Sequence, residues 1–253
     1  MTSTLQQEAS RKLGFGARQT MSAAQKLYEV GLITYMRTDG IDIAPEAVME
    51  ARNAIKARFG EKYLPKSPRM YKNKVKNAQE AHECIRPTDM FKTPTELSLS
   101  NLDQKKLYDL IYKRTLASQM EVAKFEQTTV EISSKDNQVG LRANGQVIVF
   151  EGFIKIYQES LDEPKEQDDE YRLPNIFLGD GLRKNTVSSQ QHFTQPQPRF
   201  TEATLVKKME ELGIGRPSTY ASTIERILNN GYAFRKGRAL CATAKAIMCG
   251  SLL

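Results

Sequence analysis

The sequence has few of the residues that build metal sites or disulfide frameworks. Its 253 residues include three cysteines and two histidines, and no cysteine pair has the Cys-x-x-Cys spacing that is common in zinc sites. An odd number of thiols without a pairing pattern is typical of a reducing compartment. These observations argue against a structural zinc site and against a small secreted protein that is held together by disulfides.

Long apolar runs are also absent from the sequence. Uninterrupted apolar runs reach only four residues, as in Val147–Phe150, whereas a helix that spans a bilayer needs about 20. The first residues lack the basic start and the apolar stretch of a secretory signal. We therefore expect no membrane span and a cytoplasmic location.

Basic residues outnumber acidic ones by 37 to 30, which gives a net charge of +7 and an isoelectric point near 9.2. The excess is local, because residues 51–79, here called the basic segment, contain nine basic side chains against Glu61 alone. Residues 159–170 have seven acidic side chains and are typical of a solvated loop. A basic run is usually only a solvated face, but the strong bias of this one also predicts contact with a polyanion such as nucleic acid.

The first half of the sequence has the apolar periodicity of helices. Four segments repeat apolar residues every three or four positions, and the first three of them have glycine or proline at or near their boundaries. These predicted helices span residues 5–13, 21–28, 46–59 and 102–120.

The pattern then changes to a period of two, which is typical of strands. Residues 127–132 and 139–150 alternate in this way, and Asn144-Gly145 is a dipeptide that favours a hairpin turn. The further expectations for this region are an extension of the β segment toward Tyr157, a strand at residues 182–187 and a Gln- and Pro-rich connector at residues 191–198.

The last part of the sequence predicts two helices followed by a hairpin. The helices span Thr201–Leu212 and Pro217–Asn229, and the short glycine turn between them gives a helix-turn-helix pattern. Residues 232–240, around Lys236-Gly237, are expected to form a wing-like hairpin. Together with the earlier segments, this pattern predicts an α+β fold that is mainly α.

Tyr35 and Arg37 lie two residues apart in the segment Gly31–Gly40. In an extended chain this spacing places both side chains on one face. A guanidinium favours the phenolate form of a nearby tyrosine and also binds phosphate oxygens. Two interpretations are open, a nucleophile beside its phosphate partner and an ordinary half-buried packing tyrosine, and these residues alone favour the second.

Two further segments carry groups that bind phosphates. His82 and Arg86 follow the basic segment, and an arginine can bind a phosphate through two hydrogen bonds. A single histidine in a loop is more often a capping or packing residue. Arg216, Ser218 and Thr219 are expected at the start of a helix, where free backbone N–H groups attract anions. The alternative for this third segment is a tight glycine turn with a helix cap.

These three segments and two others closely resemble motifs of the bacterial type IA DNA topoisomerases, the topoisomerase I family. The resemblance covers residues 2 to about 232, and the motifs follow one another in the family's order. The segments that carry it are Thr2–Gly14, Gly31–Gly40, Gln79–Thr88, Pro198–Met209 and Glu211–Ala221.

The resemblance implies a chemistry for the matched residues. In that family the tyrosine that corresponds to Tyr35 attacks a DNA phosphodiester and becomes joined to a 5′-phosphate while a 3′-hydroxyl leaves, so rejoining needs no ATP. Arg37 is then the partner of the phosphate and of the transition state, and Asp39 is a nearby polar support. The matched residues that are implied to contact the DNA backbone near Tyr35 are His82, Arg86, Arg216, Ser218 and Thr219.

The resemblance also implies partners and a metal. The substrate is expected to be DNA, as single-stranded segments of a supercoiled duplex. The family's Mg²⁺ is bound by a glutamate and an Asp-x-Asp-x-Glu run in a separate Toprim domain, which should precede Thr2. Asp168-Asp169-Glu170 has the wrong spacing for this site. We therefore expect no metal ligands in this chain, and no activity unless a Toprim domain is supplied in trans.

Two positions depart from the family's pattern. Asn230 stands where a basic residue is usual, and the tail after Leu240 diverges. The expected organisation is that of a central topoisomerase fragment, and the alternative is a fragment that binds the backbone of single-stranded DNA without catalysis. The expected segments are a lead-in helix from the arch at residues 1–17, a helical domain with the tyrosine at 18–125, β strands of the arch at 126–198 and a truncated helical DNA-binding domain at 199–253.

Overall fold

The computed structural model describes residues 1–71, 83–159, 173–174, 176–194 and 196–252. These residues divide into two units. The larger unit combines residues 1–122, 153–163 and 199–253, and the smaller unit combines residues 123–152 and 164–198. Within the described ranges, no helix is long and apolar enough to cross a membrane.

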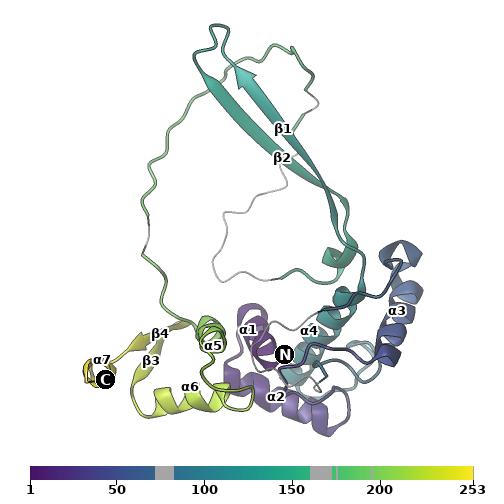
Figure 1. The fold of residues 1–253 in the computed structure, drawn as a ribbon, viewed down its shortest axis with the longest axis vertical. Helices are drawn as coiled ribbons and strands as arrows, with labels where there is room; N and C mark the ends of the chain where they lie inside the picture. The colour runs from purple at the N-terminus through teal and green to yellow at the C-terminus, as the bar shows by residue number, and fades with distance from the viewer. Residues whose placement is uncertain (72–82, 160–172, 175, 195, 253) are drawn as a thin grey trace. The chain divides into compact units, whose positions relative to one another are not determined.

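Helices form the first part of the larger unit, and their ends follow from the residues at their boundaries (Figure 1). Gly14 ends the first helix with a φ of 70°, a left-handed conformation that glycine adopts without strain. Pro45 begins the third helix, at a position where no N–H donor is needed. All four predicted helices are confirmed. The elements are α1 (Thr2–Leu13), α2 (Ala17–Glu29), α3 (Pro45–Phe59), the 3-10 turn η1 (Glu61–Tyr63) and α4 (Leu102–Gln119).

Arginines of the basic segment hold α3 and the loop after it against neighbouring elements. The Arg58 guanidinium donates to the hydroxyl of Tyr112 on α4. Arg69 forms an ion pair with Glu121 (3.1 Å), and Arg52 donates to a backbone carbonyl of the same loop (2.8 Å). These three arginine side chains therefore make contacts within the protein. Fewer charges of the basic segment therefore remain for a polyanion than the sequence count suggests.

The smaller unit contains an antiparallel ribbon of two strands, β1 (Lys124–Ser133) and β2 (Gly140–Phe150) (Figure 1). The strands pair along their whole length, from Lys124 with Phe150 to Ser133 with Gly140. The two strands predicted from alternation are confirmed, although β1 begins three residues before its predicted start.

The hairpin turn lies at a different place from the predicted one. Asn144-Gly145 is inside β2 and is paired with β1, so the predicted turn is wrong. The chain turns at residues 134–139, where Asn137 has a φ of 56° and the Asp136 carboxylate accepts a backbone N–H two residues further on. Asp and Asn supply the side-chain acceptor and the left-handed conformation that a turn needs. A turn at this place lets both strands pair over their full length, which a turn at Asn144-Gly145 would prevent.

Two other β predictions are also wrong. The chain after β2 forms a 3-10 turn, η2 (Gly152–Lys155), instead of extending as a strand to Tyr157. Residues 182–187 are irregular and exposed. A strand needs a neighbour for its backbone groups, and no described segment pairs with these residues.

The last part of the larger unit contains the predicted helix pair and hairpin. The Thr201 hydroxyl accepts the N–H of Thr204 in a capping box that begins the first of these helices. The second helix begins at Tyr220, not at Pro217, because residues 217–219 form a separate turn. A third helix follows, in a tail for which the sequence predicts no element. The elements are α5 (Glu202–Glu211), α6 (Tyr220–Asn229), β3 (Ala233–Lys236), β4 (Ala239–Ala242) and α7 (Ala244–Ser251).

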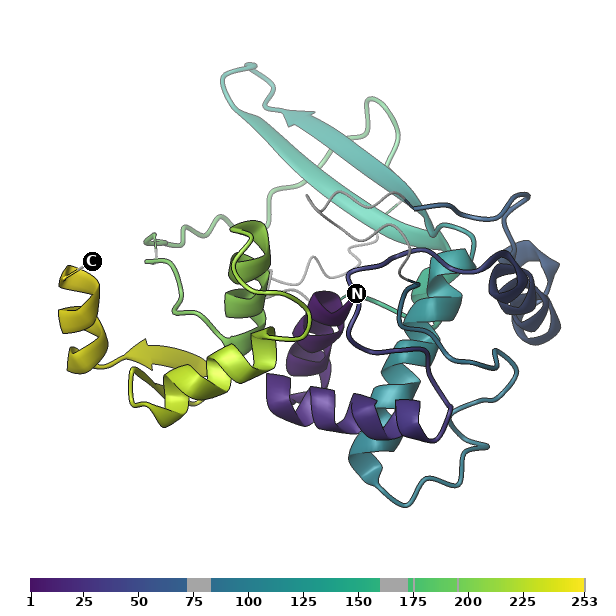
Figure 2. The same ribbon diagram turned by 60° about the horizontal axis from the view of Figure 1, so that its bottom comes forward.

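The last helices pack on the first ones within the larger unit. Figures 1 and 2 both show α1 between α5 and α4, with α6 beside α2. Segments from opposite ends of the chain therefore share one core. The mainly α, α+β class is as predicted, whereas the division into four segments stays a prediction. A buried cluster joins α2, α5 and α6 through Ala17, Val206, Met209, Tyr220 and Ile224.

A buried carboxylate reinforces this packing. Glu202 Oε2 accepts the backbone N–H of Ala17 (2.7 Å), at the first residue of α2. Glu202 Oε1 accepts Nε and Nη2 of Arg235 on β3 (2.9 and 2.6 Å). A carboxylate at a helix N-terminus stabilises the positive end of the helix dipole. One side chain thus ties α5 to α2 and to the hairpin.

Candidate active site

Tyr35 and Arg37 project from the same side of the segment that joins α2 to α3. Met36 and Thr38 are buried, whereas Arg37 is exposed and Tyr35 is 50% exposed. The segment is irregular, with isolated bridges at Ile33 and Asp42, and it is not a strand of a sheet. Exposed Tyr35 and Arg37 flank buried Met36, which agrees with the common face expected from the spacing. Tyr35 is half-buried, so the packing interpretation stays open beside the nucleophile interpretation.

Hydrogen bonds join the segment of Tyr35 to the segment of Arg86. The N–H of Thr34 donates to the Arg86 carbonyl (2.9 Å), and the Arg86 N–H donates to Thr34 Oγ1 (2.9 Å). Further along, Thr38 Oγ1 donates to the Glu83 carbonyl (2.9 Å). Two motifs that are far apart in the sequence are therefore held side by side.

The side chain of Arg86 makes its hydrogen bonds within this pair of segments. Its Nε donates to the Glu83 carboxylate (2.7 Å), its Nη1 donates to the Pro87 carbonyl (2.9 Å), and only 13% of the side chain is exposed. Glu83 also accepts the N–H of Ala44, just before α3. Arg86 therefore anchors the loop, and a contact with DNA stays a prediction. His82 lies outside the described residues.

Tyr28, on the last turn of α2, packs against Tyr35. The ring centroids are 5.3 Å apart and the ring planes meet at 69°, an edge-to-face contact. Gly31 has a φ of 72°, and its N–H donates to the Tyr28 carbonyl (2.8 Å), so the chain folds back after the helix. The sequence analysis missed this contact. The only sequence feature that points to this contact is the aromatic residue at the end of the helix before the Tyr35 motif.

Arg216, Ser218 and Thr219 lie in an exposed turn directly before α6. Thr219 Oγ1 accepts the N–H of Arg216 (2.8 Å), which closes the turn. Gly215 has a φ of 83°, and a Cβ at this position would lie 3.1 Å from Thr219 Oγ1, so the position requires glycine. The predicted groups thus stand before the helix rather than inside it. The interpretation of this segment as a tight glycine turn describes its geometry well.

Electrostatics relate this turn to Asp39. Burial raises the pKa of Tyr220, the first residue of α6, and the carboxylate of Glu210 raises this pKa further. The charge of Arg216 lowers the same pKa and that of Asp39 raises it. Hydrogen bonds of α1 connect the Tyr35 motif to the end of α5, because the Thr2 N–H donates to the Thr38 carbonyl (2.8 Å) and the Ser3 hydroxyl donates to Glu210 (2.6 Å).

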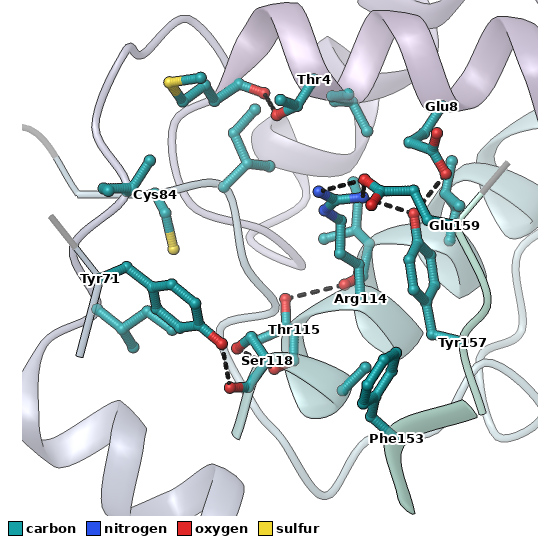
Figure 3. A pocket seen from close by; sticks show the side chains of 18 residues that line it. Thr4, Glu8, Tyr71, Cys84, Arg114, Thr115, Ser118, Phe153, Tyr157 and Glu159 are labelled. Carbon is teal, nitrogen blue, oxygen red and sulfur yellow. Dashed lines mark hydrogen bonds and ion pairs between the residues drawn. The ribbon is translucent and has the colours of Figure 1, made fainter. Parts of the chain in front are cut away.

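A cavity of about 410 Å³ lies beside the paired segments, where Ile41 and Cys84 line it (Figure 3). On its polar wall, the Tyr157 hydroxyl donates to Glu8 (2.5 Å) and accepts Nη1 of Arg114 (2.6 Å). Burial, and then the bond to Glu8, raise the pKa of Tyr157. Figure 3 shows these side chains turned toward one another. The charged groups of this wall pair among themselves, so the cavity does not resemble a phosphate site.

The described residues contain no cluster of three or more His, Cys, Asp or Glu side chains that could hold a metal ion. Asp39 and Glu210 do not belong to such a cluster. Asp168-Asp169-Glu170 lies outside the described residues. The described part of the chain therefore does not fit a Mg²⁺ site.

Comparison with known proteins identifies the family. A sequence model of a family described as DNA topoisomerase matches residues 1–253. This chain belongs to that family. The DNA topoisomerase 1 of Streptomyces coelicolor is 54% identical over 245 residues, which are 94% of this chain and 26% of that protein. The DNA topoisomerase 1 of Rickettsia conorii is 49% identical over 241 residues, 92% of this chain and 31% of that protein. The family predicted from the motifs is confirmed.

A solved structure extends this likeness to the fold. The structure of full-length topoisomerase I from Thermotoga maritima in a monoclinic crystal form matches with a TM-score of 0.81 and 40% sequence identity. The match covers 99% of this chain and 41% of that one. The topoisomerase fold class is therefore confirmed. This topoisomerase chain spans about a quarter to a third of the length of the curated relatives described above.

Proposed function

We propose that this topoisomerase chain supplies the nucleophile and the phosphate partner for breaking and rejoining one DNA strand. The Tyr35 hydroxyl loses its proton and its oxygen attacks a backbone phosphorus. The bond from phosphorus to the 3′ oxygen then breaks, and that oxygen takes up a proton and leaves as a 3′-hydroxyl. The reverse steps rejoin the strand, so no nucleotide is consumed. Passage of DNA between the two reactions relaxes supercoils.

The common exposed face of Tyr35 and Arg37 is the observation that carries this proposal. The Arg37 guanidinium would bind the phosphate and stabilise the charge that spreads over its oxygens in the transition state. The buried neighbours Met36 and Thr38 hold the backbone between these groups. Asp39 follows as a partly buried polar support.

The DNA strand is proposed to follow the exposed turn before α6. Arg216, Ser218 and Thr219 would contact its phosphates, and His82 and Arg86 would add contacts near Tyr35. Such contacts read the backbone and not the bases, so single-stranded DNA should bind with little sequence preference. Its affinity should fall steeply as the salt concentration rises. The expected cytoplasmic location agrees with this substrate and stays a prediction.

Magnesium is proposed to come from a Toprim domain that is supplied in trans, since the described residues do not fit such a site. A bound Mg²⁺ ion would position the phosphate and neutralise part of its charge. The test is relaxation of supercoiled plasmid by the purified chain, with and without a Toprim domain and Mg²⁺. We expect relaxation only when both are added, and we expect EDTA to abolish it.

Other outcomes of this assay distinguish the alternatives. Relaxation by the chain alone that EDTA does not change would contradict the proposal that a separate Toprim domain supplies the Mg²⁺ site. Salt-sensitive binding of single-stranded DNA, without relaxation under any condition, would favour a fragment that binds DNA without catalysis.

A further inference from the structure

One hydroxyl group holds the backbone on both sides of Arg37. Thr2, the first residue of α1, is completely buried. Its Oγ1 donates to the Met36 carbonyl (2.7 Å) and accepts the N–H of Thr38 (2.9 Å). The Met36 carbonyl belongs to the peptide unit before Arg37, and the Thr38 N–H belongs to the peptide unit after it. The N–H of Thr2 also donates to the Thr38 carbonyl (2.8 Å).

These contacts restrict the conformation of Arg37. Peptide units are planar, so the orientations of the two units that flank a residue define its φ and ψ and the direction of its side chain. A single oxygen atom of Thr2 holds both units. The side chains of Met36 and Thr38 are themselves buried, which limits motion of the same stretch. No local sequence pattern predicts this arrangement, because Thr2 and Met36 are 34 residues apart.

We propose that Thr2 is a positioning residue that holds the Arg37 guanidinium where it meets the phosphate attacked by Tyr35. This inference rests on the function proposed above. Thr2 is buried and does not reach DNA, so it acts through the backbone of Arg37. Loss of its hydroxyl should therefore slow formation of the bond between tyrosine and DNA and leave DNA affinity nearly unchanged. A misplacement of about 1 Å in a catalytic group can cost on the order of 10²-fold in rate.

Three variants separate this role from a general effect on α1. Thr2→Val removes the hydroxyl and keeps the branched shape, whereas Thr2→Ser keeps the hydroxyl. Ser3→Ala is the matched control, because the Ser3 hydroxyl donates to Glu210 (2.6 Å) and not to the segment of Arg37. Each variant is combined with a Toprim domain and Mg²⁺. The rate of covalent adduct formation is measured at saturating 3′-labelled single-stranded oligonucleotide, and the Kd is measured separately.

We expect Thr2→Val to slow adduct formation by about 10-fold to 100-fold, with a Kd within about 2-fold of that of the unaltered chain. Thr2→Ser and Ser3→Ala should react at nearly the unaltered rate. An unaltered rate in Thr2→Val would overturn the proposal. An equal loss in Ser3→Ala, or a loss confined to the Kd, would overturn it as well.

Amide hydrogen exchange gives a second test that needs no activity. In the unaltered chain and in Thr2→Ser, the Thr38 amide should exchange slowly, and in Thr2→Val it should exchange fast while amides of α4 stay protected. Free exchange of the Thr38 amide in the unaltered chain would overturn the proposal, even if Thr2→Val does not fold. If the unaltered chain forms no adduct although this amide is protected, the proposed function is wrong. The positioning role then fails with it, while the contact itself stands.

Discussion

The rings of Tyr28 and Tyr35 meet edge to face, with centroids 5.3 Å apart. Tyr28 belongs to α2, whose position is fixed by the shared core of the larger unit. Tyr35 stands in an irregular segment and is half exposed. The contact therefore connects the proposed nucleophile to a rigid element and restricts the orientations of its ring.

Replacement of Tyr28 tests this connection. An edge-to-face pair is worth about 0.5–1.5 kcal/mol, so Tyr28→Ala should slow adduct formation at Tyr35 by up to about 10-fold at saturating DNA. Tyr28→Phe keeps the ring and should react at close to the unaltered rate. The measurement is the rate of covalent trapping of a labelled oligonucleotide in the presence of a Toprim domain and Mg²⁺. An equal loss in both variants would instead assign the effect to the Tyr28 hydroxyl.

The buried carboxylate of Glu202 predicts a stability effect. Glu202→Gln keeps the size of the side chain but removes the charge that Ala17 and Arg235 face. Hydrogen bonds to charged groups are worth about 1.5–3 kcal/mol each, so we expect the free energy of unfolding to fall by about 2 kcal/mol. Urea unfolding followed by circular dichroism measures this change.

Glu211→Gln is the control for this substitution. Glu211 is on the same helix and pairs with Lys208 at the surface, where both side chains are about half exposed. Exposed pairs contribute about 0–1 kcal/mol, so this variant should change stability little. Equal effects of the two substitutions would contradict the role given to Glu202.

The thiol of Cys84 predicts a dependence on pH. Burial raises the pKa of Cys84 to about 11, from a usual value near 9. The thiolate is the reactive form, so alkylation of Cys84 by iodoacetamide should be slow at pH 8 and should rise about tenfold per pH unit toward pH 11. Exposed Cys249 is the internal reference. Equal labelling of both cysteines at pH 8, measured by peptide mass spectrometry, would contradict this prediction.

The same pKa shift contributes to stability with a definite sign. The fold favours the protonated thiol of Cys84, so this contribution is fully present below about pH 9. It is lost as the pH rises from about 9 to about 11, because the unfolded chain releases the proton first. Cys84→Ser should therefore reduce the fall of the melting temperature over this pH range.

The helices could be predicted because their signals are local. Apolar periodicity, with Gly14 and Pro45 at helix boundaries, is enough to predict α1 and α3 within a few residues. The turn of the long hairpin could not be predicted in this way. Asn144-Gly145 and Asp136-Asn137 both have suitable turn chemistry, and the pairing of the whole strands, which is not local, decides between them.

At the candidate site, too, the local features could be predicted from the sequence and the long-range contacts could not. The spacing of Tyr35 and Arg37 predicts their common face, because adjacent side chains of an extended segment alternate. The contacts that hold this face come from Thr2 and from Thr38 with Glu83, which are distant in the sequence. These long-range contacts depend on the tertiary structure and are visible only there.

The central claim is that Tyr35 becomes covalently attached to DNA. The most direct measurement is mass spectrometry of proteolysed adducts, formed from the chain, a Toprim domain, Mg²⁺ and a single-stranded oligonucleotide. We expect a 5′-phosphate linked to Tyr35, and no adduct in Tyr35→Phe, which should still fold and bind DNA because only the hydroxyl is lost. Attachment at Tyr28 or Tyr220, or no attachment when the Toprim domain is functional, would contradict the claim.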